Sequence, residues 1–140
     1  MKRILFSILL LLSGLVAAFA QQQLEGVFVN KDLNLRLRLN LYQADIPVPG
    51  LELDSCYGHL TGSVNGMWIV LKVKELDENG ALVRAASERG SDAQDLRIDL
   101  TDEGISVRQQ GDTNIKGVKN RKYVKLPKTI LLTREGEGRR

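Results

Sequence analysis

The sequence predicts an all-β domain, and three observations lead to this prediction. Leu33–Leu41 alternates leucine with polar residues without an error, which collects the leucines on one face of a strand. Turn signals rich in Gly, Asn and Asp recur about every 8–12 residues. After the first 20 residues, no long segment has helical periodicity. About eight or nine short strands at this spacing are typical of a β-sandwich or a β-barrel.

The first 20 of the 140 residues predict a helical export signal that is removed. Lys2 and Arg3 precede an almost continuous apolar run over residues 4–12, and Ala18-Phe19-Ala20 offers small residues at a cleavage site. An uncleaved membrane anchor is the alternative, since about 17 apolar residues can just span a bilayer. The polar Gln21–Gln23 that follows favours cleavage. We expect an exported protein, periplasmic or extracellular, with no transmembrane segment after cleavage.

The remaining chain is long enough for one domain, which we place at residues 21–135, followed by a disordered tail at 136–140. The formal charge of +3 includes Lys2 and Arg3, and without them 18 basic residues face 17 acidic ones. This balance argues against nucleic acid as a partner. One Cys and one His exclude an intramolecular disulfide and a His-rich metal site, and no metal or cofactor motif is present.

The first strands are expected at Leu24–Val29 and Leu33–Leu41. Leucine favours helices, but the strict alternation should outweigh that propensity. The long connection Gln43–Asp54 carries Pro47 and Pro49 and could cross an open end of a barrel.

Asn65-Gly66 predicts a two-residue type I′ hairpin turn, which fixes a register. The turn would place four pairs on an apolar face: Val64–Met67, Gly62–Ile69, Leu60–Leu71 and Gly58–Val73. The other face would pair Ser63–Trp68, Thr61–Val70, His59–Lys72 and Tyr57–Lys74. From this polar face we take four candidate ligand-binding residues: Tyr57, His59, Trp68 and Lys72.

Further turns are expected at Asp77–Gly80, Arg89–Asp92, Thr101–Gly104 and Gly111–Asn114, between strands near residues 82–87, 96–100 and 105–110. The four-residue turn at Thr101 would place Leu100 beside Ile105 on the core face. It would also oppose Arg97 and Arg108, which is unfavourable unless Asp95 or Asp99 lies between them. Short strands at residues 115–119, 123–126 and 129–134 complete the set, with Pro127 at a break or bulge.

The opening Gly26-Val27-Phe28, the consecutive hairpins and Arg134 at the end of the last strand together resemble the calycin-type β-barrels, which include the lipocalin-like and avidin-like proteins. In that group a Gly-x-Trp near the start often packs beside a late Arg, and Phe28 stands here at the Trp position. The resemblance implies a single antiparallel up-and-down barrel of about eight strands with a cavity that could hold a ligand.

Catalytic groups are not expected, and we predict that the protein is not an enzyme. Cys56 and His59 are three residues apart on one expected strand, so they should point to opposite faces and form no dyad. His59 should resist protonation beside Lys72. Asp92 and Asp95 could serve as paired carboxylates of a hydrolase, but no aromatic sugar platform lies nearby in the sequence.

Charge divides the second half of the chain into an acidic and a basic part. Residues 75–112 hold ten acidic and four basic side chains, whereas residues 116–140 hold nine basic and two acidic ones. We define six of the basic residues as the basic strip: Lys116, Lys119, Arg121, Lys122, Lys125 and Lys128. This strip could contact an anionic surface, or it could be a solvated face that complements the acidic half.

We therefore expect an exported, non-catalytic binding module. Its partner would be a small molecule, a glycan, or a protein or other component of the cell envelope. The alternative is a structural envelope protein that contacts anionic surfaces through the basic strip. The sequence does not define an oligomeric state.

Overall fold

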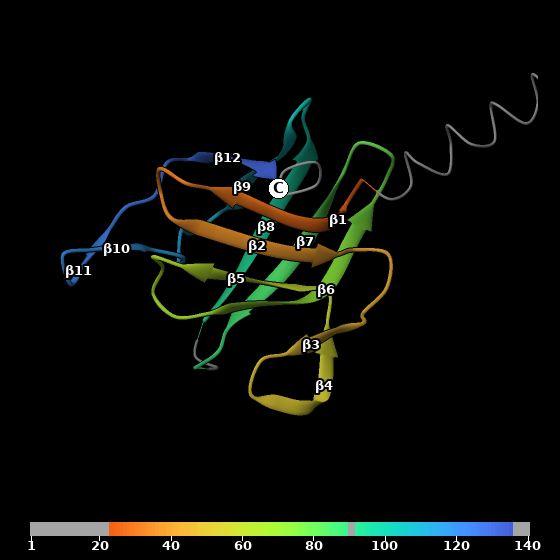
Figure 1. Cartoon of the computed structure of the whole chain (residues 1–140), viewed down its shortest axis with the longest axis horizontal. Coiled ribbons are helices and arrows are strands. Elements are labelled where there is room, and N and C mark those ends of the chain that lie inside the picture. Colours follow the sequence, from red (N-terminus) through yellow and green to blue (C-terminus); the bar gives the residue numbers. More distant parts are fainter. Residues whose placement is uncertain (1–22, 90–91, 136–140) are drawn as a thin grey trace, which may run out of the picture.

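The computed structural model describes residues 23–89 and 92–135, and every regular element in them is a β-strand (Figure 1). The predicted export signal at 1–20 and the tail at 136–140 lie outside the described residues. Eight strands form one closed antiparallel barrel. They are β1 (Glu25–Asn30), β2 (Leu35–Asn40), β5 (Gly58–Gly62), β6 (Trp68–Leu76), β7 (Gly80–Ser87), β8 (Ala93–Leu100), β9 (Gly104–Gln110) and β12 (Thr129–Arg134).

Around the barrel the order is β1–β12–β9–β8–β7–β6–β5–β2, so each barrel strand pairs with the next one along the chain. This order confirms the predicted up-and-down barrel. The two other pairs are short sheets set between barrel strands: β3 (Ile46–Val48) with β4 (Leu51–Cys56), and β10 (Gly117–Lys119) with β11 (Lys122–Val124).

The leucine alternation of β2 faces the barrel interior, as the pattern predicts. Leu35, Leu37 and Leu39 are buried, while Arg36 and Arg38 between them are exposed. The strand begins later than expected because Lys31–Asn34 forms the turn from β1. Asn34 has a φ of 54°, and its N–H donates to the carbonyl of Lys31.

Side chains fill the barrel. Phe28, Trp68, Val83 and Ile98 are each at most 1% exposed, and they pack with the inward leucines in one continuous core. The cavity that remains in this core measures about 20 Å³ and is lined by apolar side chains apart from Gln109. A pocket for a small ligand usually measures about 300–1,000 Å³, so this space is large enough for about one water molecule.

The predicted register of the β5–β6 hairpin is wrong. Leu60 pairs with Trp68 instead of Leu71, and Gly58 pairs with Val70 instead of Val73. The shift of three residues is an odd number, so the two faces of β6 exchange. Trp68 points into the barrel, while Leu71 is 56% exposed on the outside.

The side chain of Asn65 explains why the tight turn does not form. Its Oδ1 accepts hydrogen bonds from Trp68 Nε1 at 3.1 Å and from the Lys116 N–H at 3.0 Å, and its Nδ2 donates to the Asn114 carbonyl at 3.1 Å. Trp68 and the two distant partners, Asn114 and Lys116, hold Asn65 in a wider loop over residues 63–67. A two-residue turn would compete with all three bonds.

The hairpins of the acidic half match their predictions. Leu100 pairs with Ile105 and Arg97 with Arg108 across the β8–β9 turn, and Arg97 Nε donates to Asp99 at 3.1 Å. The neighbouring carboxylate thus relieves the repulsion of the two arginines. At the β6–β7 turn, the side chain of Asp77 accepts the N–H groups of the two residues that end it.

One barrel end is covered by the segment that joins β9 to β12. Val118 N donates to Ser63 O at 2.9 Å, and Val64 forms a bridge with Gly117. Ile115 and Leu126 from this segment are buried in the barrel core. The segment therefore closes this end with apolar side chains and leaves β10–β11 outside as a projecting hairpin (Figure 1).

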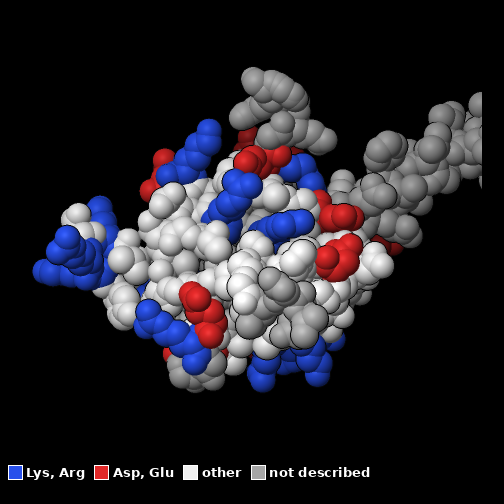
Figure 2. Space-filling model, turned by 60° about the horizontal axis from the view of Figure 1, so that its bottom comes forward, with Lys and Arg blue, Asp and Glu red and all other residues white. Residues whose placement is uncertain are grey.

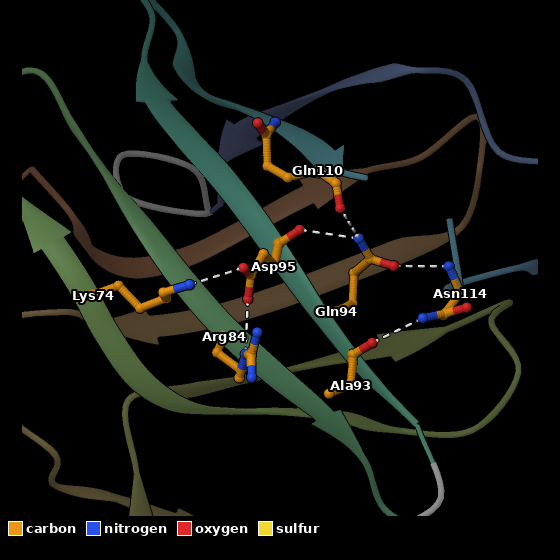
Figure 3. Close-up of polar contacts among 7 residues, drawn as sticks. All are labelled: Lys74, Arg84, Ala93, Gln94, Asp95, Gln110 and Asn114. Atoms are coloured by element: carbon orange, nitrogen blue, oxygen red, sulfur yellow. Dashed lines mark hydrogen bonds and ion pairs between the residues drawn. The ribbon is translucent and has the colours of Figure 1, made fainter. Parts of the chain in front are cut away.

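Four amide side chains hold this covering segment in place. Gln94 Oε1 accepts the Asn114 N–H at 2.7 Å, and its Nε2 donates to the Gln110 carbonyl at 3.0 Å (Figure 3). Gln109 makes a matching pair of bonds with the backbone of Ile115 at 2.9 and 3.0 Å. Asn65 and Asn114 add the bonds to neighbouring loops.

Arg134 joins the two ends of the described chain where the barrel closes. Its guanidinium lies 4.7 Å from the centre of the Phe28 ring and donates to the carbonyls of Gln23 and Glu25 at 2.6 and 2.7 Å. A Cβ on Gly26 would come within 2.5 Å of Arg134 Nη1. Glycine at this position therefore leaves the space that the arginine occupies.

The connection between β2 and β5 does not simply cross a barrel end, as the sequence suggested. It forms the β3–β4 sheet, which packs against the outer wall of the barrel through a second small core of Ile46, Val48, Cys56 and Ile69. Pro47 lies at the register shift of this sheet. Ile69 faces away from the barrel interior and is buried by the β3–β4 sheet. The sequence did not reveal this apolar partner of Ile69.

Candidate functional site

The four predicted ligand-binding residues do not share one surface. Trp68 lies inside the barrel, and His59 on the outer wall pairs with Arg38 and Ile69 of the neighbouring strands. Lys72 is exposed opposite Arg84, and Tyr57 lies half-buried in the bend between β4 and β5. The altered β5–β6 register separates these residues, because the prediction had placed them on one face.

His59 has a lowered pKa, but the predicted cause is wrong. Burial is the main cause, and the positive charge of Arg38 on β2 adds to it. Lys72 lies three residues beyond the actual partner Ile69. Among the described residues, Nδ1 of His59 is buried and has no hydrogen-bond partner. The imidazole is therefore held in its neutral form.

Cys56 and His59 do not lie on one strand, which corrects the premise used for this pair. β4 ends at Cys56 and β5 begins at Gly58, with a bend at Tyr57. The Cys56 thiol donates to the carbonyl of Gly58 at 3.3 Å, and burial raises its pKa. A buried, protonated thiol committed to a carbonyl is a poor nucleophile.

Asp95 is paired with two cations on the outer face of the barrel wall. Its two oxygens accept from Arg84 Nε at 2.8 Å and from Lys74 Nζ at 2.9 Å (Figure 3). The hydrogen bonds with Arg84 and then Lys74 lower the pKa of the carboxyl. Asp95 is therefore held ionised and is poorly suited to donate a proton to a glycosidic oxygen, while Asp92 is exposed at the end of its loop.

The structure gathers the basic strip on and beside the projecting hairpin. Lys119, Arg121 and Lys122 lie at its tip, and Lys125 and Lys128 follow on the path back to β12. Only Lys116, at the base, is half-buried. Figure 2 shows a blue group at the far left, where the hairpin extends from the body.

None of the six strip residues forms an ion pair with another described residue. The ion pairs among the described residues are Arg36–Glu135, Lys74–Asp95, Arg84–Asp95 and Arg97–Asp99. In the acidic half, Asp95 and Asp99 pair with cations on the barrel wall. The cations of the strip are left for solvent or a partner.

The hairpin contains the two-residue turn that the sequence had suggested at Asn65–Gly66. Asn120 and Arg121 both have positive φ, of 53° and 66°, as a type I′ turn requires. Arginine is unusual there, because a side chain other than glycine is strained in this region. Without glycine at Arg121, the turn carries no strong sequence signal.

The same hairpin exposes apolar side chains that the sequence analysis did not select. Tyr123 is 65% exposed and Val124 is 38% exposed. Tyr123 pairs with Val118 on one face, while Lys119 and Lys122 pair on the other. Alternation in so short a segment is too brief to predict which face meets solvent.

A groove of about 400 Å³ lies at the base of the hairpin. It is lined by Gln109, Gly111, Thr113, Lys125, Leu126, Pro127 and Lys128. Two lysines, a hydroxyl and an amide therefore surround a small apolar floor. These groups suit an anion with some apolar surface.

The register places acidic turns at the barrel end opposite the hairpin. The hairpin follows the end of β9, whereas the β8–β9 turn at its start carries Asp102 and Glu103. The β6–β7 turn, with Asp77 and Glu78, lies at the same end, because Gly80 pairs with Asp99. The hairpin end also carries Glu88, Asp92 and Asp112, so acidic side chains lie at both barrel ends, whereas the basic strip lies at one.

Comparison with protein-family models, with curated proteins and with solved structures finds no significant match. Among the described residues, no three His, Cys, Asp or Glu side chains form a group that could hold a metal ion. That part of the chain also has no helix with the length and apolarity to cross a bilayer.

Proposed function

We propose that this chain is an exported, non-catalytic binding protein that contacts an anionic surface through the basic strip. The barrel is the rigid scaffold, and the binding surface lies outside it. The observation that carries the proposal is the group of six cations on and beside the projecting hairpin, none of which forms an ion pair with another described residue. Clustered cations of this kind attract anionic partners.

We also propose that the barrel is calycin-like. The up-and-down order of eight strands supports this assignment. The contact of Arg134 with Phe28 beside Gly26 supports it further, since a late arginine packs in the same way in that group. The filled interior differs from a barrel that stores a ligand, which favours the outer surface as the binding site.

Two triple variants with the same change in charge test the proposed surface. Lys119, Lys122 and Lys125 are replaced by Gln in the first, and Lys31, Lys72 and Arg108 in the control, all six being exposed. Binding is measured to a sulfated polysaccharide and to vesicles that contain phosphatidylglycerol. We expect the first variant to lose binding and the control to retain it. Equal losses would show that only net charge matters, and no binding by the unaltered protein would refute the proposal.

The groove favours a second candidate function, the binding of a small anionic ligand between Lys125 and Lys128. Replacing Thr113 by Val would remove a hydroxyl from the groove and leave the hairpin tip unchanged. We expect this variant to weaken binding of a small sugar phosphate if the groove is the site. Unchanged binding in the variant, or no binding by the unaltered protein, would eliminate this candidate.

A further inference from the structure

We propose that the β10–β11 hairpin inserts Tyr123 into the headgroup layer of an anionic phospholipid bilayer. This inference rests on the proposed function of the basic strip and adds the class of partner and the residue that penetrates it. The membrane would be approached from outside, by an exported protein, and bound at its surface.

The shape of the hairpin favours a bilayer over other anionic partners. β10 and β11 form a separate two-stranded sheet that is joined at its base to the β5–β6 loop by the Val64–Gly117 bridge, and the hairpin projects from the barrel end (Figure 1). A projecting two-stranded tip is convex, so it does not enclose a sugar or the side chain of a protein. A lipid headgroup layer is deformable and can admit such a tip.

The side chains of the hairpin combine the two features that an interfacial anchor needs. Tyr123 pairs with Val118 on one face and is 65% exposed. Tyrosine is suited to the membrane interface, because its ring is apolar and its hydroxyl stays hydrated. Lys119 and Lys122 pair on the other face, where they can reach lipid phosphates.

The turn at the tip of the hairpin holds a charged residue in a strained backbone conformation. Arg121 has a φ of 66°, where glycine would be free of strain. Strained residues of this kind occur where function requires the side chain. In the proposed orientation, this guanidinium is at the leading end of the hairpin and meets the phosphates first.

The position of the basic strip at one barrel end favours the same orientation, although Glu88, Asp92 and Asp112 also lie at that end. The acidic turns with Asp77, Glu78, Asp102 and Glu103 lie at the opposite barrel end. An anionic membrane attracts the hairpin end and repels this end, so the domain should bind end-on. Figure 2 shows acidic groups over the body of the domain and none on the projecting tip.

Tryptophan substitutions with matched exposure test insertion. The natural Trp68 is 1% exposed inside the barrel, so its emission reports on folding and not on contact with lipid. The full chain, expressed with its own export signal and purified after export, is compared as Tyr123→Trp and Leu131→Trp. Leu131 is 62% exposed on the barrel wall, close to the 65% of Tyr123. Vesicles of phosphatidylcholine are used with and without about one third of phosphatidylglycerol.

We expect a blue shift of the Tyr123→Trp emission on the anionic vesicles only, and no shift for Leu131→Trp. Binding without a shift at position 123, or a larger shift at position 131, would refute insertion by the hairpin. In that case, loss of binding in the lysine variant would still support the proposed function. Binding to the sulfated polysaccharide but not to anionic vesicles would refute the bilayer alone, and binding to neither would refute both proposals.

Discussion

Arg121 places a positive charge at the tip of the hairpin at the expense of local stability. Its φ of 66° lies in the left-handed region, where a non-glycine residue costs about 1–2 kcal/mol. Glycine would remove this strain, although its freedom in the unfolded chain offsets part of the gain.

We expect Arg121→Gly to stabilise the hairpin by about 0.5–1 kcal/mol and to weaken binding to anionic vesicles. Hydrogen exchange of the β10–β11 amides measures the first effect, and vesicle binding measures the second. Asn120→Gly is the control, because it relaxes the same turn and removes no charge. If Arg121→Gly bound as tightly as the unaltered protein, the guanidinium would have no role at the tip.

Arg134 connects the last strand of the barrel to the first through its contacts with Phe28 and the backbone of Glu25. Replacing it by Met should lower the free energy of unfolding by about 1–3 kcal/mol, since it removes a cation–π contact and two charge-assisted hydrogen bonds. Arg108→Met is the control: it removes an arginine that faces Arg97, so stability should stay equal or rise slightly. Denaturant unfolding measures both. An equal loss in the two variants would mean that the contact with Phe28 is not stabilising.

His59 gives the domain a specific pH dependence. Burial and Arg38 hold its pKa below the ordinary value of about 6.5, so the unfolded chain binds the proton more readily than the folded one. Stability should therefore be full above that value and fall as the pH drops through the lowered pKa of the folded state. The chain has one histidine, so His59→Phe should abolish the fall that begins as the pH drops below about 6.5. If the stability of His59→Phe depended on pH as that of the unaltered protein does, the fall would come from carboxylates and not from His59.

At the scale of elements, the sequence predicted the register of a hairpin where the turn signal and the apolar pattern of its strands indicate the same pairing. The β8–β9 pairing follows from Thr101–Gly104 together with an unambiguous apolar pattern. The β5–β6 pairing does not, because both faces of β6 carry apolar side chains. The outer one, Ile69, is buried by the β3–β4 sheet. A register can be read from one strand only where a single face of that strand is covered.

The candidate site was predictable only in part for a related reason. The clustered lysines and arginines of the strip are visible in the sequence, and the structure brings them together. The group of Tyr57, His59, Trp68 and Lys72 depended on the β5–β6 register, so one wrong pairing dispersed it. The exposure of Tyr123 depends on β10–β11 leaving the barrel, which no local pattern determines.

The amide network determines whether the covering segment stays on the barrel end. Gln94→Leu should lower the free energy of unfolding by about 1–3 kcal/mol, because the Asn114 N–H and the Gln110 carbonyl would lose their partner. Gln110→Leu is the control, since its side chain makes one long bond of 3.4 Å, and it should change stability by less than about 0.5 kcal/mol. Thermal unfolding of both variants measures the difference. A small effect of Gln94→Leu would show that water replaces the lost bonds.

At the scale of the whole molecule, the basic strip at one barrel end predicts a strong dependence of binding on salt. The screening length falls from about 10 Å at 0.1 M salt to about 3 Å at 1 M. Binding to anionic vesicles should weaken severalfold over this range, and sedimentation with the vesicles measures it. Binding that persists unchanged at high salt would show that apolar contacts of the hairpin dominate and that the strip is secondary.

The seam where β1 meets β12 has a consequence for biogenesis. Val29 and Thr133 bond across it although they are 104 positions apart in the chain. The cylinder therefore cannot be completed until the last strand has been synthesised and has reached the same compartment as the first. For the export that we propose, this delay would keep the chain open during passage through a secretion channel, because the barrel closes only after both end strands have crossed.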